Sequence, residues 1–126
     1  MPAVDTKVLV RLLTADDPAQ TARAEAFLAH GPVWVSTVVL VEAVWVLSTV
    51  YGWDKVQLLA MLATLADSRD FVVQEPLAVA AAIAGFSQNP ADFADCLALE
   101  LARANGHLPF ATFDARAARL PGAVKP

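Results

Sequence analysis

Short apolar runs alternate with longer segments of helical periodicity along the 126 residues of the chain. The short runs are rich in valine and phenylalanine and are bounded by polar or turn-forming residues, a pattern that predicts buried strands. The predicted strands are residues 3–4, 33–35, 71–73 and 108–112, with a final short strand around residues 123–125. Short strands that alternate with helices are typical of an α/β fold whose parallel sheet is covered on both faces.

Capping residues mark several of the predicted helices. Asp17 followed by Pro18 is a typical helix N-terminus, and Ser36 or Thr37 caps the long helix after the second strand. Asp54 caps the next helix in the same way. The predicted helices cover approximately residues 8–13, 17–29, 37–51, 54–65, 76–86 and 91–104.

Composition favours one domain over residues 1–126, because a hydrophobic content of 57% supplies a single core and no repeat or linker interrupts the chain. The net charge of −4 argues against nucleic-acid binding through a broad basic face. Cys96 is the single cysteine, which excludes an intramolecular disulfide and fits the reducing cytoplasm. Asp5 and Lys7 interrupt the first apolar residues, so we expect no signal peptide.

Glu42 is the only charged residue between Gly31 and Trp53. The apolar segment of residues 32–53 is long enough to cross a bilayer, which takes roughly 20 residues. Its first residues instead predict a strand and a helix start, and no basic cluster flanks it. We therefore expect no membrane span, and a carboxylate in this segment needs a partner from elsewhere in the chain.

Five acidic residues are placed where one site can form. Asp5 and Asp114 follow predicted strands, whose carboxyl ends meet at one edge of a parallel sheet. Asp92 and Asp95 share a face at the start of a helix, and Glu42 lies about two turns into its own helix. Converging carboxylates repel one another, and a hard divalent cation with oxygen ligands removes that repulsion. The pattern indicates a Mg²⁺ or Mn²⁺ site of the kind that activates water in many nucleases.

Four motifs carry a resemblance to a known family. They are Asp5-Thr6, Ser36 with Glu42 in an apolar helix, Asp92-Phe93-Ala94-Asp95, and Thr112-Phe113-Asp114. In this order and spacing the chain closely resembles a PIN domain of the VapC-type toxin ribonucleases. The resemblance implies a Rossmann-like α/β/α fold with a parallel sheet of four or five strands. It also implies Mg²⁺- or Mn²⁺-dependent endonucleolytic cleavage of RNA, with a cognate antitoxin and a second copy of the chain as partners.

The resemblance extends to individual residues. The acidic quartet of the family corresponds to Asp5, Glu42, Asp95 and Asp114, with Asp92 as a fifth acid found in many members. Hydroxyl groups that would orient these carboxylates or bind water correspond to Thr6, Thr112 and Ser36. The family usually has Asn after the Asp-Thr pair, whereas this chain has Lys7. An ammonium near Asp5 would compete with a metal or hold a phosphate, so a catalytically silent binding module with the same fold is the alternative function. A phosphatase ranks below both, because the chain has no glycine-rich phosphate loop.

The cations that would meet RNA phosphates are Lys7, Arg11, Arg116 and Arg119, for which a solvated charge on a helix face is the competing interpretation. Taken singly, Asp5 and Asp92 are typical helix caps, Asp114 is a typical turn residue, and Asp16-Asp17 predicts a solvated helix start. His30 and His107 adjoin glycines and are expected to be exposed, whereas Cys96 is expected to be buried. The tryptophans are expected in the core or at a dimer contact. They are Trp34, Trp45 and Trp53.

Overall fold

The computed structural model describes residues 1–126 and divides into two compact units, Met1–Gln74 and Glu75–Pro126. Each unit contains helices and one pair of parallel strands, so the α/β class is confirmed. The two units are described in turn.

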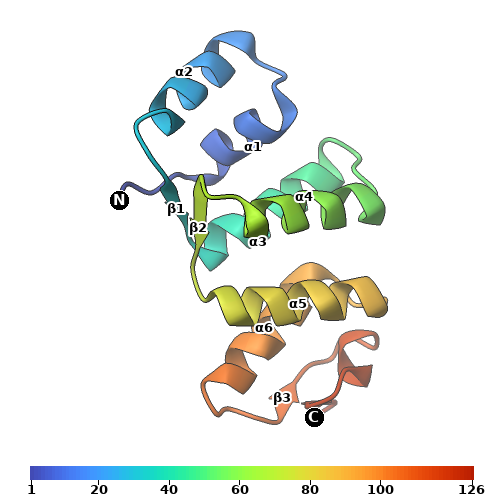
Figure 1. Ribbon diagram of the computed structural model, residues 1–126. Helices are drawn as coiled ribbons and strands as arrows, with labels where there is room; N and C mark the ends of the chain where they lie inside the picture. The colour runs from blue at the N-terminus through green and yellow to red at the C-terminus, as the bar shows by residue number, and fades with distance from the viewer. The chain divides into compact units, whose positions relative to one another are not determined.

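In the first unit, two strands and the N-terminal segment run in parallel. β1 (Val33–Val35) pairs with β2 (Phe71–Val73) in the register Val33 to Phe71, and Figure 1 shows the two strands side by side. Ala3 forms an isolated parallel bridge with Trp34 of β1, and the amide of Val4 donates to the carbonyl of Trp34 at 3.2 Å. The carboxyl ends of all three segments therefore lie at the same edge, where Asp5, Ser36 and Gln74 follow them.

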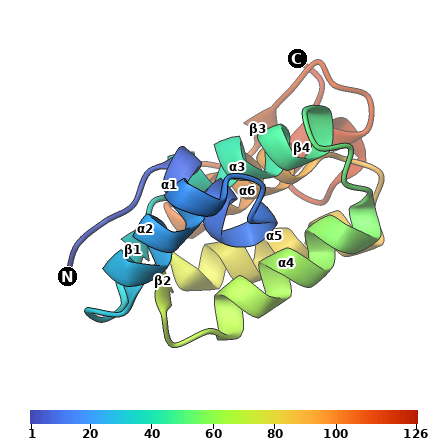
Figure 2. The same cartoon turned by 90° about the horizontal axis from the view of Figure 1, so that it is seen from above.

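Four helices complete this unit: α1 (Thr6–Thr14), α2 (Pro18–Leu28), α3 (Thr37–Thr49) and α4 (Lys55–Asp67). α1 packs against both α2 and α3, and α4 packs against β2; Figure 2 shows α1 and α2 as neighbours. The apolar side chains of β1 and the inner faces of these helices form the core. Its most buried members include Leu9, Val33, Val35, Leu40, Leu47 and Leu62.

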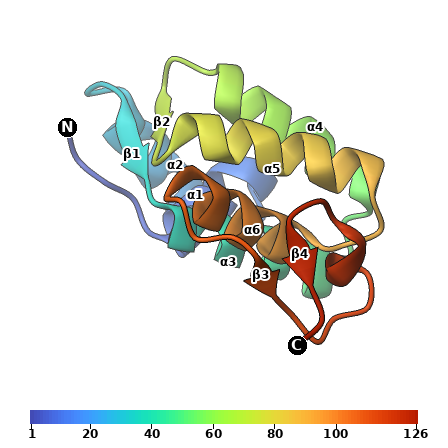
Figure 3. The same ribbon diagram turned by 90° about the horizontal axis from the view of Figure 1, so that it is seen from below.

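In the second unit, α5 (Pro76–Gln88) and α6 (Phe93–Ala104) pack against each other (Figure 3). The rings of Phe86 and Phe93 meet edge to face at 5.9 Å between centroids, a favourable aromatic geometry. β3 (Phe110–Ala111) then pairs in parallel with β4 (Ala123–Val124), and the single-turn helix η1 (Ala117–Arg119) lies between them along the chain. The Arg103 guanidinium of α6 donates to the carbonyl of Pro121 and ties α6 to the turn before β4.

The predicted elements recur in the structure with small shifts at their ends. α1 begins at Thr6 rather than residue 8, and α6 begins at Phe93 because Asp92 caps it. The expected sheet of four or five strands is not confirmed, since each strand pair has two members and residue 3 contributes only a bridge. None of the helices has the length and hydropathy that crossing a bilayer requires.

Of the two expectations for the tryptophans, a place in the core is wrong for Trp34 and Trp45, and a dimer contact stays a prediction. Trp45 is 62% exposed on α3, Trp34 lies on the outward face of β1, and Trp53 is half-buried. The alternation of strand residues explains Trp34, because its neighbours Val33 and Val35 take the two buried positions.

Candidate functional site

Asp5 is held at the end of the N-terminal segment as the N-cap of α1. Val4 before it is buried, and the Asp5 carboxylate accepts a hydrogen bond from the amide of Val8 at Oδ1, 2.9 Å away. The capping interpretation of Asp5 is therefore correct. Its side chain is exposed, and Oδ2 has no hydrogen-bond partner in the protein. Capping fixes the direction of the carboxylate and leaves one oxygen for a ligand.

Ser36 occupies the corresponding position after β1, where it caps α3. Its hydroxyl oxygen accepts from the amide of Val39 at 3.1 Å. Gln74 follows β2 and accepts, through Oε1, from the Thr37 amide at 2.9 Å. The ends of β1 and β2 are thus joined at the first turn of α3, which fixes the start of the helix that carries Glu42.

Glu42 lies on an exposed face of α3 together with Val38, Trp45 and Thr49. It takes part in no ion pair. The apolar sequence around Glu42 suggests that its carboxylate is costly to bury. That cost does not arise, because the side chain is exposed. The inner face of α3 is apolar at Leu40, Ala43, Val44 and Leu47.

Asp92 and Asp95 lie together at the N-terminus of α6. Asp92 is the N-cap, and its Oδ1 accepts from the amide of Asp95 at 2.8 Å. The partial positive charge of the helix N-terminus favours ionised carboxylates there. Nevertheless the pKa of the half-buried Asp95 carboxyl is raised above its ordinary value of 3.8, first by burial and then by the negative charges of Asp92 and Asp114.

Asp114 follows β3 and organises the turn into η1. Its Oδ1 accepts from the amides of Arg116 and Ala117, both at 2.9 Å. The amide of Asp114 itself donates to the Thr112 hydroxyl at 3.0 Å. The turn interpretation of Asp114 is therefore correct, and Thr112 contacts the backbone of the acid that it was expected to orient. As with Asp5, Oδ2 of Asp114 has no hydrogen-bond partner in the protein.

Arg11 differs from the other candidate cations because it is already bonded within the protein. Its guanidinium donates to Gln20 at 2.6 Å, to Asp16 at 3.1 Å and to the Tyr51 hydroxyl at 3.2 Å. The Tyr51 hydroxyl donates in turn to Asp16 at 2.6 Å. Arg11 is therefore not a merely solvated charge: it joins the α1–α2 loop to the residues that follow α3, while its contact with RNA stays a prediction.

The same bonds correct the expectation for Asp16. This carboxylate is exposed but not merely solvated, and its pKa is lowered from 3.8, chiefly by the hydrogen bond from Tyr51. Asp17 beside it is the N-cap of α2, as expected. Lys7, Arg116 and Arg119 are exposed and form no ion pairs.

The family model for the PIN domain matches residues 3–123. The chain belongs to the PIN domain family. Members of this family are generally nucleases that bind RNA, and the matched stretch contains every acidic residue of the candidate site. A comparison with curated proteins finds no significant match, and neither does a comparison with solved structures.

The acids of this PIN domain suit a divalent cation in their chemistry. The candidate ligands offer only oxygen atoms. Asp95 is repelled by the carboxylates of Asp92 and Asp114, and none of these three acids forms an ion pair with a basic side chain. His30 and His107 are exposed, as expected, and Cys96 is 2% exposed and buried against Gly85. Within neither unit do three His, Cys, Asp or Glu side chains come close enough to hold a metal ion.

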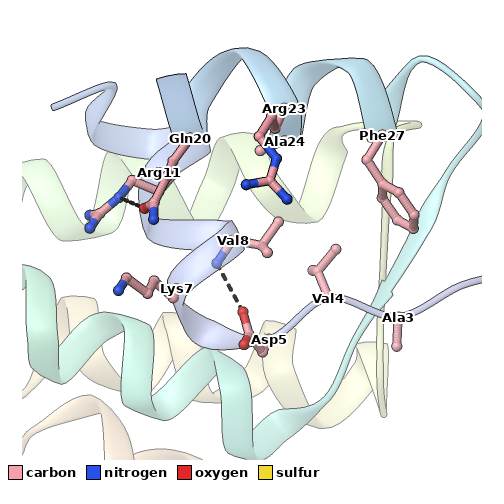
Figure 4. Close-up of a pocket in the computed structure, with 10 residues that line it drawn as sticks. All are labelled: Ala3, Val4, Asp5, Lys7, Val8, Arg11, Gln20, Arg23, Ala24 and Phe27. Carbon is pink, nitrogen blue, oxygen red and sulfur yellow. Dashed lines mark hydrogen bonds between the residues drawn. The ribbon is translucent and has the colours of Figure 1, made fainter. Parts of the chain in front are cut away.

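Sequence reasoning missed two residues that lie near Asp5. Arg23 and Phe27 of α2 line a cavity of about 550 Å³ together with Asp5 and Lys7 (Figure 4). The spacing of Gln20, Arg23, Ala24 and Phe27 places them on one face of α2, a signal that was available in the sequence. It could not show that α1 and residues 3–5 form the facing wall.

Proposed function

We propose that this PIN domain is a metal-dependent endoribonuclease of the VapC type, the toxin of a type II toxin–antitoxin pair. The observation that carries the proposal is the environment of Asp95, whose pKa is raised by burial and by two neighbouring carboxylates. Carboxylates arranged to repel one another are costly in a purely structural role, and perturbed pKa values gather at functional sites. Membership of a nuclease family supports the same function.

The proposed ligands are Asp5, Glu42, Asp95 and Asp114, with Asp92 as a fifth acid. An all-oxygen donor set favours Mg²⁺ or Mn²⁺ over Zn²⁺. Such an ion activates water and neutralises the charge that develops on a phosphodiester under in-line attack.

The chain's own residues position these groups. Caps fix Asp5 and Asp92, and the Thr112 hydroxyl holds the backbone of Asp114. Glu42 is proposed to serve as a ligand or as the base that takes the proton of the attacking water. Thr6 and Ser36 are proposed to orient the carboxylates.

Lys7, Arg116 and Arg119 are proposed to contact RNA phosphates, because all three are exposed cations without an ion pair. Arg11 stays a prediction for this role, although its guanidinium is already bonded within the protein. The proposed protein partners are an antitoxin that blocks the site and a second copy of the chain, in the cytoplasm.

Cleavage of RNA by the purified protein tests this function. We expect cleavage with Mg²⁺ or Mn²⁺, none with excess chelator, and recovery when the metal is restored. Asp5→Asn should lower the rate by at least about 100-fold, since even groups that only support metal ligands cost 10- to 100-fold when they are removed. Asp67→Asn, an exposed acid at the end of α4, is the matched control and should leave the rate unchanged. Equal cleavage in chelator, or a fully active Asp5→Asn variant, would contradict the mechanism.

A catalytically silent binding module is the second candidate, and Lys7 is the observation that favours it. Lys7 is exposed on the first turn of α1 and lines the same cavity as Asp5. An ammonium that turned toward Asp5 would compete with a cation for it, although the two form no ion pair in this structure. If the protein is silent, Lys7→Asn should create metal-dependent cleavage from an inactive starting point. If the protein is an enzyme, the same change should alter an activity that is already present.

A further inference from the structure

The cavity beside Asp5 is an open pocket that is lined by residues of α1, α2 and the segment 3–5 of the first unit. Its volume of about 550 Å³ lies within the range of sites that take small organic ligands, roughly 300–1,000 Å³. Apolar side chains such as Val8 and Phe27 line it together with cationic ones. A ligand that fits must therefore combine an apolar surface with negative charge.

Charge in the cavity is opposite to that of the whole chain. Lys7, Arg11 and Arg23 line it against the single acid Asp5, whereas the chain carries a net charge of −4. The Arg11 guanidinium is bonded to Gln20 and Asp16, but Lys7 and Arg23 belong to no ion pair. Two cations without partners remain for an anionic ligand.

Arg23 and Phe27 divide the cavity between a charged and an aromatic part. Figure 4 shows the Arg23 guanidinium reaching from α2 over Val8, while the Phe27 ring lies beside Ala3 and Val4. Phe27 is 44% exposed, so its ring is accessible to a ligand. Exposed aromatic rings next to arginine are the features on which proteins stack the bases of single-stranded RNA.

We propose that this cavity binds one nucleotide of a single-stranded RNA, with its phosphate on Arg23 and Lys7 and its base against Phe27. The inference rests on the proposed function, since Asp5 at the edge of the cavity is a proposed metal ligand. The nucleotide bound here is then a close neighbour of the phosphodiester that is cleaved. The Lys7 and Arg23 cations beside the Phe27 ring match the phosphate and the base of one nucleotide, and an acidic peptide is tested below as the other occupant.

RNA binding in the presence of chelator tests the cavity without any cleavage. The measurement is fluorescence anisotropy of a short labelled single-stranded RNA with the full chain, at several salt concentrations. Arg23→Gln should weaken binding by about 10-fold and reduce the salt dependence of log Kd by about 0.7, the value for one phosphate contact to a single strand. Phe27→Leu keeps an apolar side chain but removes the ring, and should weaken binding by about 5-fold or more with an unchanged salt slope. Phe27→Trp should preserve affinity.

Arg69→Gln is the control, because Arg69 is an exposed cation of the same unit that belongs to no ion pair and does not line the cavity. It should change Kd by less than about 2-fold. Equal weakening by Arg69→Gln and Arg23→Gln would overturn the inference, since binding would then be diffuse attraction. Failure of the wild type to bind RNA would also overturn it, as would binding of an acidic peptide in place of RNA. Loss of metal-dependent cleavage with the binding pattern intact would contradict the proposed function alone.

Discussion

Two carboxylates, Asp16 in the first unit and Asp95 in the second, are held in opposite ways. In the first, Asp16 is bonded to Tyr51 and Arg11, and its pKa is lowered. In the second, Asp95 has two further carboxylates as its neighbours, and its pKa is raised. An acid that stabilises a fold is paired with a cation or a hydrogen-bond donor of the protein. An acid that lies among other acids needs a cation from solution to relieve the repulsion. The difference distinguishes Asp16, which serves the fold, from Asp95, which is a candidate ligand.

The largest expected effect is on RNA cleavage. Asp95→Asn should lower the metal-dependent rate by at least about 100-fold, because it removes a proposed ligand. Asp16→Asn makes the same chemical change at an acid with partners and should leave the rate within about 3-fold of wild type. Steady-state cleavage of a labelled RNA measures both. Equal losses in the two variants would remove the distinction between the two kinds of acid.

The next effect is on thermal stability, and it tests whether a metal ion supplies the positive charge that Asp95 lacks. Mn²⁺ or Mg²⁺ should raise the melting temperature of the wild type, since a ligand that binds only the folded state adds about 2.7 kcal/mol at 100 times its Kd. Asp95→Asn should reduce this gain, and Asp67→Asn should keep it. Thermal melts followed by circular dichroism give the comparison, with samples in chelator as the metal-free reference. A metal-induced gain that survives Asp95→Asn would place the ion elsewhere.

A smaller effect, a loss of folding stability, is expected when the Arg11 cation that bonds Asp16 is removed. The Arg11 side chain is only 17% exposed and donates to three partners, so Arg11→Ala removes the donor to Gln20 and to the Tyr51 hydroxyl and one of the donors to Asp16. We expect a loss of about 1–3 kcal/mol in the free energy of unfolding, the usual cost of breaking a part-buried polar network. Arg119→Ala removes an exposed cation without an ion pair and should cost less than about 0.5 kcal/mol. Urea unfolding at neutral pH measures both variants.

Local signals predicted the helices of this chain well. Asp17, Ser36 and Asp54 cap α2, α3 and α4 as expected, because a cap and the amide it binds are three residues apart in the sequence. The strands and their parallel orientation were also predicted, but not which strands pair with each other. Strand pairing and helix docking join residues such as Val33 and Phe71, which no local pattern connects.

The candidate site shows the same division between local and distant information. Sequence motifs indicated the candidate acids, and local spacing indicated that Asp5 and Asp92 are helix caps. The role of Arg11, in contrast, depends on Tyr51, which is 40 residues away. A basic residue near an acidic motif can serve RNA or the fold, and sequence spacing does not separate these roles. The apolar neighbours of Glu42 did not reveal its setting, because they are divided between an inner and an exposed face of α3.

The smallest effect is the pH dependence of the same two acids, measured in chelator. A raised folded-state pKa means that Asp95 lowers stability as pH rises from 3.8 through that pKa. Asp95→Asn should therefore melt higher than wild type at pH 7, by up to about 3 °C given its partial exposure, and this gain should shrink as pH falls toward 3.8. Asp16 has the opposite sign, because its lowered pKa contributes stability above 3.8 that is lost as pH falls through the folded-state value. Asp16→Asn should melt lower at pH 7 and converge with wild type in acid. If both variants shift the melting temperature in the same direction at pH 7, Asp16 and Asp95 are not held in opposite ways.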